Sequence, residues 1–167
     1  IYVTLEGGER DLQLIRAIQN YVTTMGRTGR GNIPIHDPKE ILGEMRVIKS
    51  PQEIDWIKES CRISGISHRN VMAQSRAGMN ERELQALLFK EFYSQFAMRE
   101  GYFSIIAAGA NATILHYRDN NCNSKDGDLV LIDAGAEKNY YTADITRTYP
   151  LNGKFTSAQK DVYSRVL

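Results

Sequence analysis

The chain has 167 residues, of which 42% are hydrophobic and 25% charged, as in an ordinary globular protein. This length suits one domain, or one domain with a fragment of another. The formal net charge of +1 excludes the strong electric field that favours nucleic acids or anionic membranes, so we expect neither as a partner. The sequence also lacks a run of about 18 apolar residues that would predict a membrane span.

The N-terminal residues are typical of the end of an α/β unit. Ile1–Leu5 predicts a short strand, and the apolar stripe within Asp11–Met25 predicts a helix. Glycines and prolines between Gly26 and Pro38 predict a loop or linker. The basic stretch Arg27–Arg30 is short and without aromatic residues, which favours a solvated loop over a nucleic-acid site.

Three capping boxes predict the starts of three further helices. In each box a polar N-cap residue is followed three positions later by Glu or Gln, so that both side chains can satisfy backbone amides of the first turn. The pairs are Ser50 with Glu53, Asn80 with Glu83, and Thr156 with Gln159. The last of these helices reaches the apolar end of the chain, and we therefore expect the chain to be truncated.

The pattern between the second and third of these helices changes to β-type. The runs Tyr102–Ala108, Leu129–Ala134 and Tyr140–Tyr149 are rich in β-branched, aromatic and small residues and are bounded by turn residues. This order of elements predicts an α+β fold in which helices cover one face of a mostly antiparallel sheet.

Two aspartates in this region are candidate metal ligands. A hairpin with its loop at Lys138–Asn139 would place Asp133 directly opposite Asp144, with Cβ atoms about 5 Å apart. Like charges opposed in a sheet destabilise it unless a proton is shared or a cation is bound, and carboxylates are natural ligands of divalent metals. The alternatives are that Asp133 is a turn residue and that Asp144 pairs with Arg147.

His116 is the candidate catalytic histidine. It follows a strand-like run and a Gly109–Asn111 turn, where an imidazole could contact a peptide carbonyl or move a proton. A purely structural histidine remains the alternative, and we interpret His68 and His36 as structural or exposed. Common nucleophile and phosphate-binding motifs do not occur in the sequence.

The two cysteines, Cys61 and Cys122, lack the spacing of a zinc finger or a thioredoxin-like pair. Separated thiols are typical of a reducing compartment, so we expect a cytoplasmic location. A single disulfide between the two cysteines is the alternative. The chain begins with Ile1 instead of methionine, so its natural N-terminus can lie upstream.

The sequence resembles the aminopeptidase P (Xaa-Pro aminopeptidase) group of the M24 metallopeptidases. The similarity covers about two-thirds of the chain, and its motifs follow one another in the order typical of that group. They are Glu44–Pro51 with Glu53, Ile114–Tyr117, Gly127–Gly135, Ala143–Pro150 and Asn152–Thr156 with Gln159.

The resemblance implies a pita-bread fold, with residues 1–45 as the end of a creatinase-N-like α/β domain and its linker, and residues 46–167 as the first half of the catalytic domain. It implies two divalent metal ions, usually Mn²⁺ with Zn²⁺ or Co²⁺ as alternatives, bound in part by Asp133 and by the bridging carboxylate of Asp144. His116 would contact the substrate beside a metal-bridged hydroxide. The implied reaction releases the first residue of a peptide whose second residue is proline.

The chain departs from this family in its ligand set. The family uses five metal ligands, and the other three, one His and two Glu, cannot follow Asp144 here because neither residue type occurs after it. We expect those ligands in an absent C-terminal segment, and we expect this chain alone to be inactive. Prolidase, methionine aminopeptidase, creatinase and a non-catalytic interaction protein of the same fold are the alternatives, and a homo-oligomer is possible.

Overall fold

The computed structural model describes residues 1–29 and 34–167. They form two compact units, Ile1–Lys49 and Ser50–Leu167. The predicted basic loop Arg27–Arg30 lies partly outside the described residues. The assignment of residues 1–45 to the end of a preceding domain stays a prediction.

The N-terminal unit contains the helices α1 (Glu9–Met25) and α2 (Lys39–Val47), with a short 3₁₀ turn, η1, at Gly26–Thr28. The first helix confirms the predicted one, whereas α2 was not predicted. The expected strand at Ile1–Leu5 is wrong: only an isolated parallel bridge joins Tyr2 to His36. Two backbone hydrogen bonds accompany this bridge, too few to build a ladder.

The second unit contains the three predicted helices, α3 (Pro51–Gln74), α4 (Glu81–Ser94) and α5 (Ser157–Val166). All three predicted capping boxes are present. In the first, the Ser50 hydroxyl accepts a hydrogen bond from the Glu53 amide. The Glu53 carboxylate also accepts one from the Tyr141 hydroxyl, so the start of α3 is held to a strand.

Two small antiparallel sheets complete this unit. One has the strand order β2 (Ile105–Ala108), β3 (Leu129–Asp133), β6 (Thr146–Pro150). The other has the order β1 (Arg99–Glu100), β4 (Ala136–Lys138), β5 (Tyr141–Thr142). A 3₁₀ segment, η2 (Gly109–Thr113), follows β2. Helices and antiparallel strands in one unit confirm the predicted α+β class.

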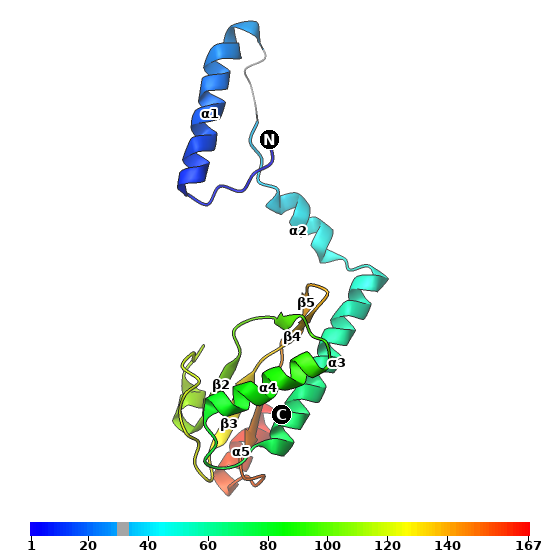
Figure 1. Ribbon diagram of the computed structural model, residues 1–167, viewed down its shortest axis with the longest axis vertical. Helices are drawn as coiled ribbons and strands as arrows, with labels where there is room; N and C mark the ends of the chain where they lie inside the picture. The colour runs from blue at the N-terminus through cyan, green and yellow to red at the C-terminus, as the bar shows by residue number, and fades with distance from the viewer. Residues whose placement is uncertain (30–33) are drawn as a thin grey trace. The chain divides into compact units, whose positions relative to one another are not determined.

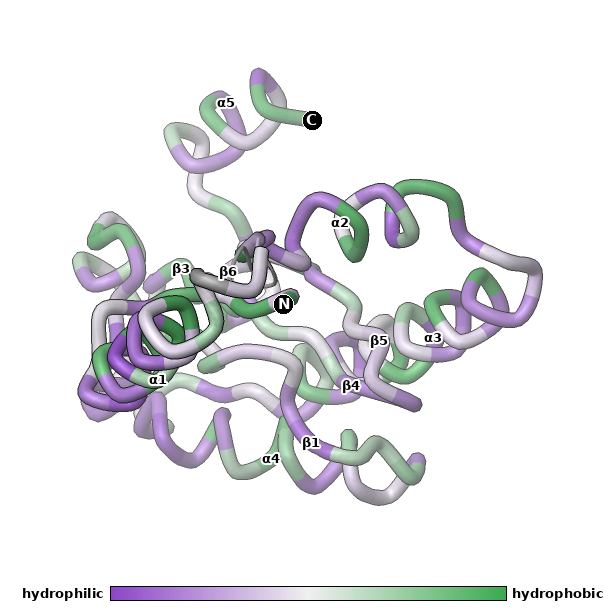
Figure 2. Tube along the Cα trace, turned by 90° about the horizontal axis from the view of Figure 1, so that it is seen from above, coloured by the Kyte–Doolittle hydropathy of each residue, from purple (hydrophilic) through white to green (hydrophobic). Residues whose placement is uncertain are grey.

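The core lies where α3 and α4 pack on each other and on the strands, as Figure 1 shows for the green helices. Its largest fully buried apolar side chains come from both helices and from β2 and β3; they are Ile63, Val71, Leu84, Leu88, Phe92, Ile106, Val130 and Ile132. Helix α5 contributes no buried residue. Figure 2 shows hydrophobic residues at its end, where Val166 is 83% exposed.

The predicted register of the hairpin between Asp133 and Asp144 is wrong by two residues. Lys138 pairs with Tyr141, and Asp133 pairs with Thr146 instead of Asp144. The loop residues are Asn139 and Tyr140, with φ of 52° and 66°, the two positive values of a type I′ turn. A turn of this type matches the right-handed twist of the two strands. The loop therefore lies one residue later in the chain than predicted.

The cap of α3 gives a first prediction. Replacing Ser50 with alanine removes the side-chain acceptor of the Glu53 amide, so the free energy of unfolding should fall by about 1 kcal/mol. Urea denaturation followed by circular dichroism measures the change. The Ser50→Asp control keeps an acceptor and should stay near the wild-type value; equal stability of all three proteins would show that the cap contributes nothing.

Candidate active site

The two predicted ligand residues are brought together in the second unit. Asp133 is the last residue of β3, and Asp144 lies in the segment between β5 and β6. Because the register shift is an even number of residues, Asp144 stays on the same face as Asp133, but diagonal to it. The alternative pairing of Asp144 with Arg147 is not among the ion pairs of the described residues.

Tyr102 joins the two carboxylates. Its hydroxyl lies 2.6 Å from Oδ1 of Asp133 and 3.1 Å from Oδ1 of Asp144, so both oxygens compete for one donated proton. The pKa of Tyr102 is raised far above its usual value. The largest cause is burial of the hydroxyl, and the hydrogen bonds to the two aspartates and their negative charges add to it. The tyrosine therefore remains a neutral donor that fixes the relative positions of two acidic side chains.

The backbone before Tyr102 places this hydroxyl. Strand β1 pairs with β4, where Glu100 lies opposite Ala136, and the Gly101 amide then donates to the Gly135 carbonyl at 2.8 Å. A Cβ on Gly101 would lie 2.5 Å from Cγ2 and 2.8 Å from Cβ of Thr142, and rotation of the threonine side chain relieves only the first contact, so this close passage favours glycine. Tyr102 consequently lies beside the end of β3, where its hydroxyl contacts Asp133.

Gly135 allows the two aspartate segments to approach each other. A Cβ at this position would lie 1.7 Å from the carbonyl oxygen of Ala143, the residue before Asp144. Hydrogen bonds on either side hold the contact, from the Ala134 amide to the Ile145 carbonyl at 3.0 Å and from the Ala143 amide to the Ala136 carbonyl at 3.2 Å. Only glycine fits between these backbones.

His116 lies in the same cleft as the carboxylates. The cleft has a volume of about 250 Å³ and is lined by Tyr102, Phe103, Ile105, His116, Arg118, Asp133 and Asp144. The His116 side chain is exposed, and its φ of 52° is in the left-handed region, which is uncommon outside glycine. The structure thus brings the predicted histidine to the predicted aspartates, 17 residues before the first of them.

The donor set of this cleft fits part of a metal site. Two carboxylates on one face suit hard or borderline divalent cations, and one carboxylate can bridge two such ions. Within residues 1–29 and 34–167, however, no group of three or more His, Cys, Asp or Glu side chains could hold a metal ion. Asp133 and Asp144 could therefore hold a metal ion only together with further ligands.

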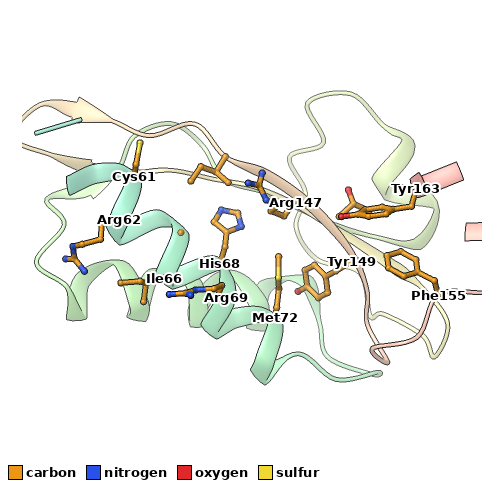
Figure 3. Close-up of a pocket in the computed structure, with 13 residues that line it drawn as sticks. Cys61, Arg62, Ile66, His68, Arg69, Met72, Arg147, Tyr149, Phe155 and Tyr163 are labelled. Atoms are coloured by element: carbon orange, nitrogen blue, oxygen red, sulfur yellow. The ribbon is translucent and has the colours of Figure 1, made fainter. Parts of the chain in front are cut away.

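A second pocket, of about 680 Å³, is a poor candidate for the same chemistry. It lies between α3, β6 and α5 and is lined mainly by apolar and basic side chains, including Arg147 and Tyr163 (Figure 3). His68 lines it and is buried, with its Nε2 3.0 Å from the Ala134 carbonyl. Burial lowers the pKa of His68, so the ring is neutral and structural, as one of the two sequence interpretations expected.

Tyr102 is the site residue that the sequence did not reveal. It stood only as the first residue of a β-type run, since nothing in its local pattern marks a hydroxyl that contacts side chains 31 and 42 residues away. A signal could have come from the charge pattern: two aspartates on one face of a sheet need a compensating donor, and a tyrosine opposite the strand end can provide it.

The model of metallopeptidase family M24 matches residues 55–167, more than half of the chain. The chain belongs to this family. Two curated relatives are the Xaa-Pro aminopeptidases of Escherichia coli strain K12 and Haemophilus influenzae. The first is 44% identical over 131 residues, which is 78% of this chain and 30% of the relative. The second is 44% identical over 133 residues, 80% of this chain and 31% of the relative.

Solved structures support the same assignment for this M24 chain. The structure of proline aminopeptidase P II from Yersinia pestis aligns with a TM-score of 0.89 and 38% sequence identity, covering 98% of this chain and 38% of the other. This match confirms the predicted fold of the pita-bread aminopeptidases. The chain spans about a third of the length of the relatives that it matches. Among the described residues, no helix is long and apolar enough to cross a bilayer.

Proposed function

We propose that this M24 chain provides the first part of the active site of a Xaa-Pro aminopeptidase, which releases the N-terminal residue from peptides with proline in the second position. The observation that carries the proposal is the cleft in which Asp133, Asp144 and His116 meet, with Tyr102 bridging the carboxylates. The similarity to Xaa-Pro aminopeptidases across most of the chain supports the substrate class.

Asp133 and Asp144 would hold two divalent ions, most suitably Mn²⁺, with Asp144 shared between them. When bound, such a pair lowers the pKa of water and polarises the scissile carbonyl. Tyr102 keeps the two carboxylates at a fixed separation, so binding requires little rearrangement. His116, exposed at the cleft, would donate a hydrogen bond to the oxyanion that forms when the peptide bond is attacked.

The family resemblance implies that the remaining ligands, one His and two Glu, follow the second aspartate, and residues 145–167 contain neither type, so we assign them to a part of the longer protein that this chain does not cover. The chain alone should therefore bind metal weakly and show no turnover. The two free, well-separated cysteines support a reducing, cytoplasmic setting.

The test is an assay of the full-length gene product with Mn²⁺ on an Xaa-Pro-Xaa tripeptide, with an Xaa-Ala-Xaa tripeptide and an Xaa-Pro dipeptide in parallel. We expect release of the first residue from the proline tripeptide, at least ~100-fold faster than from the alanine tripeptide, and loss of activity with a chelator. Preferential cleavage of the dipeptide would indicate a prolidase instead. Failure to cleave any of the three by folded, Mn²⁺-loaded protein would overturn the proposal.

The 167-residue chain, assayed alone under the same conditions, is the matched comparison. Because two carboxylates cannot hold a dinuclear centre that needs five ligands, we expect no turnover above the metal-only blank. Measurable Mn²⁺-dependent cleavage by this chain would show that the two aspartates with Tyr102 and His116 are sufficient.

A further inference from the structure

Glu81 is a fully buried carboxylate outside the cleft. It is the first residue of α4, and its exposed fraction is 0%. Four donors surround it: Oε1 accepts from the Ala108 amide at 2.8 Å and Asn111 Nδ2 at 2.9 Å, and Oε2 accepts from the Tyr117 hydroxyl and the Cys122 amide, both at 2.8 Å. A buried charge persists only when it is bonded in this way.

The four donors lie within residues 108–122, a loop segment that begins at the last residue of β2 and runs through η2, and this loop carries His116. Ala108 lies at its beginning and Cys122 at its end, and Tyr117 directly follows the histidine. The carboxylate therefore fixes both ends and the middle of the loop. His116 itself is exposed and has a positive φ, a backbone conformation that a free loop would rarely hold.

Charge favours the same arrangement. Burial alone would raise the pKa of Glu81, but the hydrogen bonds from Asn111, Cys122, Ala108 and Tyr117 together outweigh burial and hold that pKa below its usual value. The partial positive charge at the start of α4 also favours the ionised form of Glu81 over the protonated form. Glu81 is thus ionised, and an ionised acceptor makes the stronger hydrogen bonds.

We propose that Glu81 is a positioning residue for His116: it touches no substrate, but holds the loop so that the imidazole lies at the carboxylate cleft. The inference rests on the proposed function for its catalytic meaning. Its structural part, that Glu81 sets the conformation of His116, stands on the contacts alone.

The isosteric Glu81→Gln variant tests the structural part in the 167-residue chain. The NH₂ group of the new glutamine replaces one of the two carboxylate oxygens and cannot accept a hydrogen bond from a backbone amide. If it replaces Oε1, the Ala108 amide loses its acceptor; if it replaces Oε2, the Cys122 amide does. We expect hydrogen exchange of one of these amides to accelerate at least ~10-fold. The His116 ring resonances and its HN–Hα coupling, which reports φ, should shift in a protein that remains folded by circular dichroism.

Two further variants make this test decisive. The Asn111→Ala variant removes one donor and leaves the charge and the other three, so it should move the His116 signals in the same direction by less. The exposed Glu44→Gln, in the other unit, is the charge-matched control and should leave them unchanged. His116 signals that stay at wild-type positions in Glu81→Gln, or in Asn111→Ala should the first variant not fold, would overturn the proposal.

Kinetics of the full-length gene product test the catalytic part. Glu81→Gln should lower kcat about tenfold or more with little change in KM, because an oxyanion contact acts in the transition state. In a His116→Ala background it should have no further effect. An equal loss in both backgrounds would reduce Glu81 to a structural role. A wild type without peptidase activity would defeat the proposed function, and the resonance shifts would still decide the positioning.

Discussion

Replacing Gly135 with alanine should destabilise the second unit by about 4 kcal/mol or more, among the largest effects of any single substitution in the chain. The new Cβ would lie 1.7 Å from the Ala143 carbonyl oxygen and 2.5 Å from the Ala143 carbonyl carbon. Both obstacles are backbone atoms, so no side-chain rotation relieves the overlap. The two aspartate segments would have to separate, breaking the hydrogen bonds on both sides of the contact.

Urea denaturation of the variant and of the wild type measures this effect. The matched control is Gly65→Ala, within α3, where a new Cβ meets no atom within 4 Å. That substitution should be neutral or stabilise the protein by up to about 1 kcal/mol, because alanine favours helix. Similar stability of the Gly135 variant and the wild type would mean that the segments of Asp133 and Asp144 do not approach as closely as the structure shows.

Replacing Asp144 with asparagine should change function and stability in opposite directions. The full-length gene product should lose at least about 100-fold in Mn²⁺ affinity, since even the loss of an outer partner of a ligand costs ~10–100-fold. Its cleavage of the proline tripeptide should disappear with it. The metal-free 167-residue chain should instead gain roughly 0.5–1 kcal/mol, because one of two like charges on a shared face is removed.

Titration calorimetry measures the affinity, and denaturation of the chain in the presence of a chelator measures the stability. Asp55→Asn is the control: it makes the same change of charge at an exposed ion pair with Lys58, where little stability is at stake. A metal-free chain that loses stability on Asp144→Asn would contradict this, and would show that the hydrogen bond from Tyr102 to the Asp144 carboxylate contributes more than the repulsion between the two aspartates costs.

Local sequence signals predicted the helices of the second unit well. Each of the N-caps Ser50, Asn80 and Thr156 needs only residues within its own first turn, so a short stretch of sequence contains all the information. Asp133 and Asp144 lie on one face and line one cleft, as the hairpin pattern predicted, and His116 lines the same cleft, as only the family resemblance implied. Their roles as ligands and catalyst remain proposals.

Long-range and atypical features could not be predicted in this way. The turn at Asn139–Tyr140 places an aromatic residue at a positive φ, which sequence rules disfavour, and so the loop was predicted one residue too early. The Tyr102 hydroxyl donates its hydrogen bond to Asp133, 31 positions away, and a local sequence pattern contains no sign of such a contact. Glu81 resembles any acidic residue in the first turn of a helix, a position that is usually exposed, and only the fold reveals its four donors.

The hairpin that joins Asp133 to Asp144 also restricts how its length can change during evolution. Side chains alternate between the two faces of a strand, so one residue added or removed between Asp133 and the turn, with the two-residue turn kept, would carry Asp144 to the face opposite Asp133. A change of two residues would return it to the same face. Insertions and deletions within these strands should therefore survive in functional descendants in even steps, whereas the turn itself can lengthen without moving either aspartate.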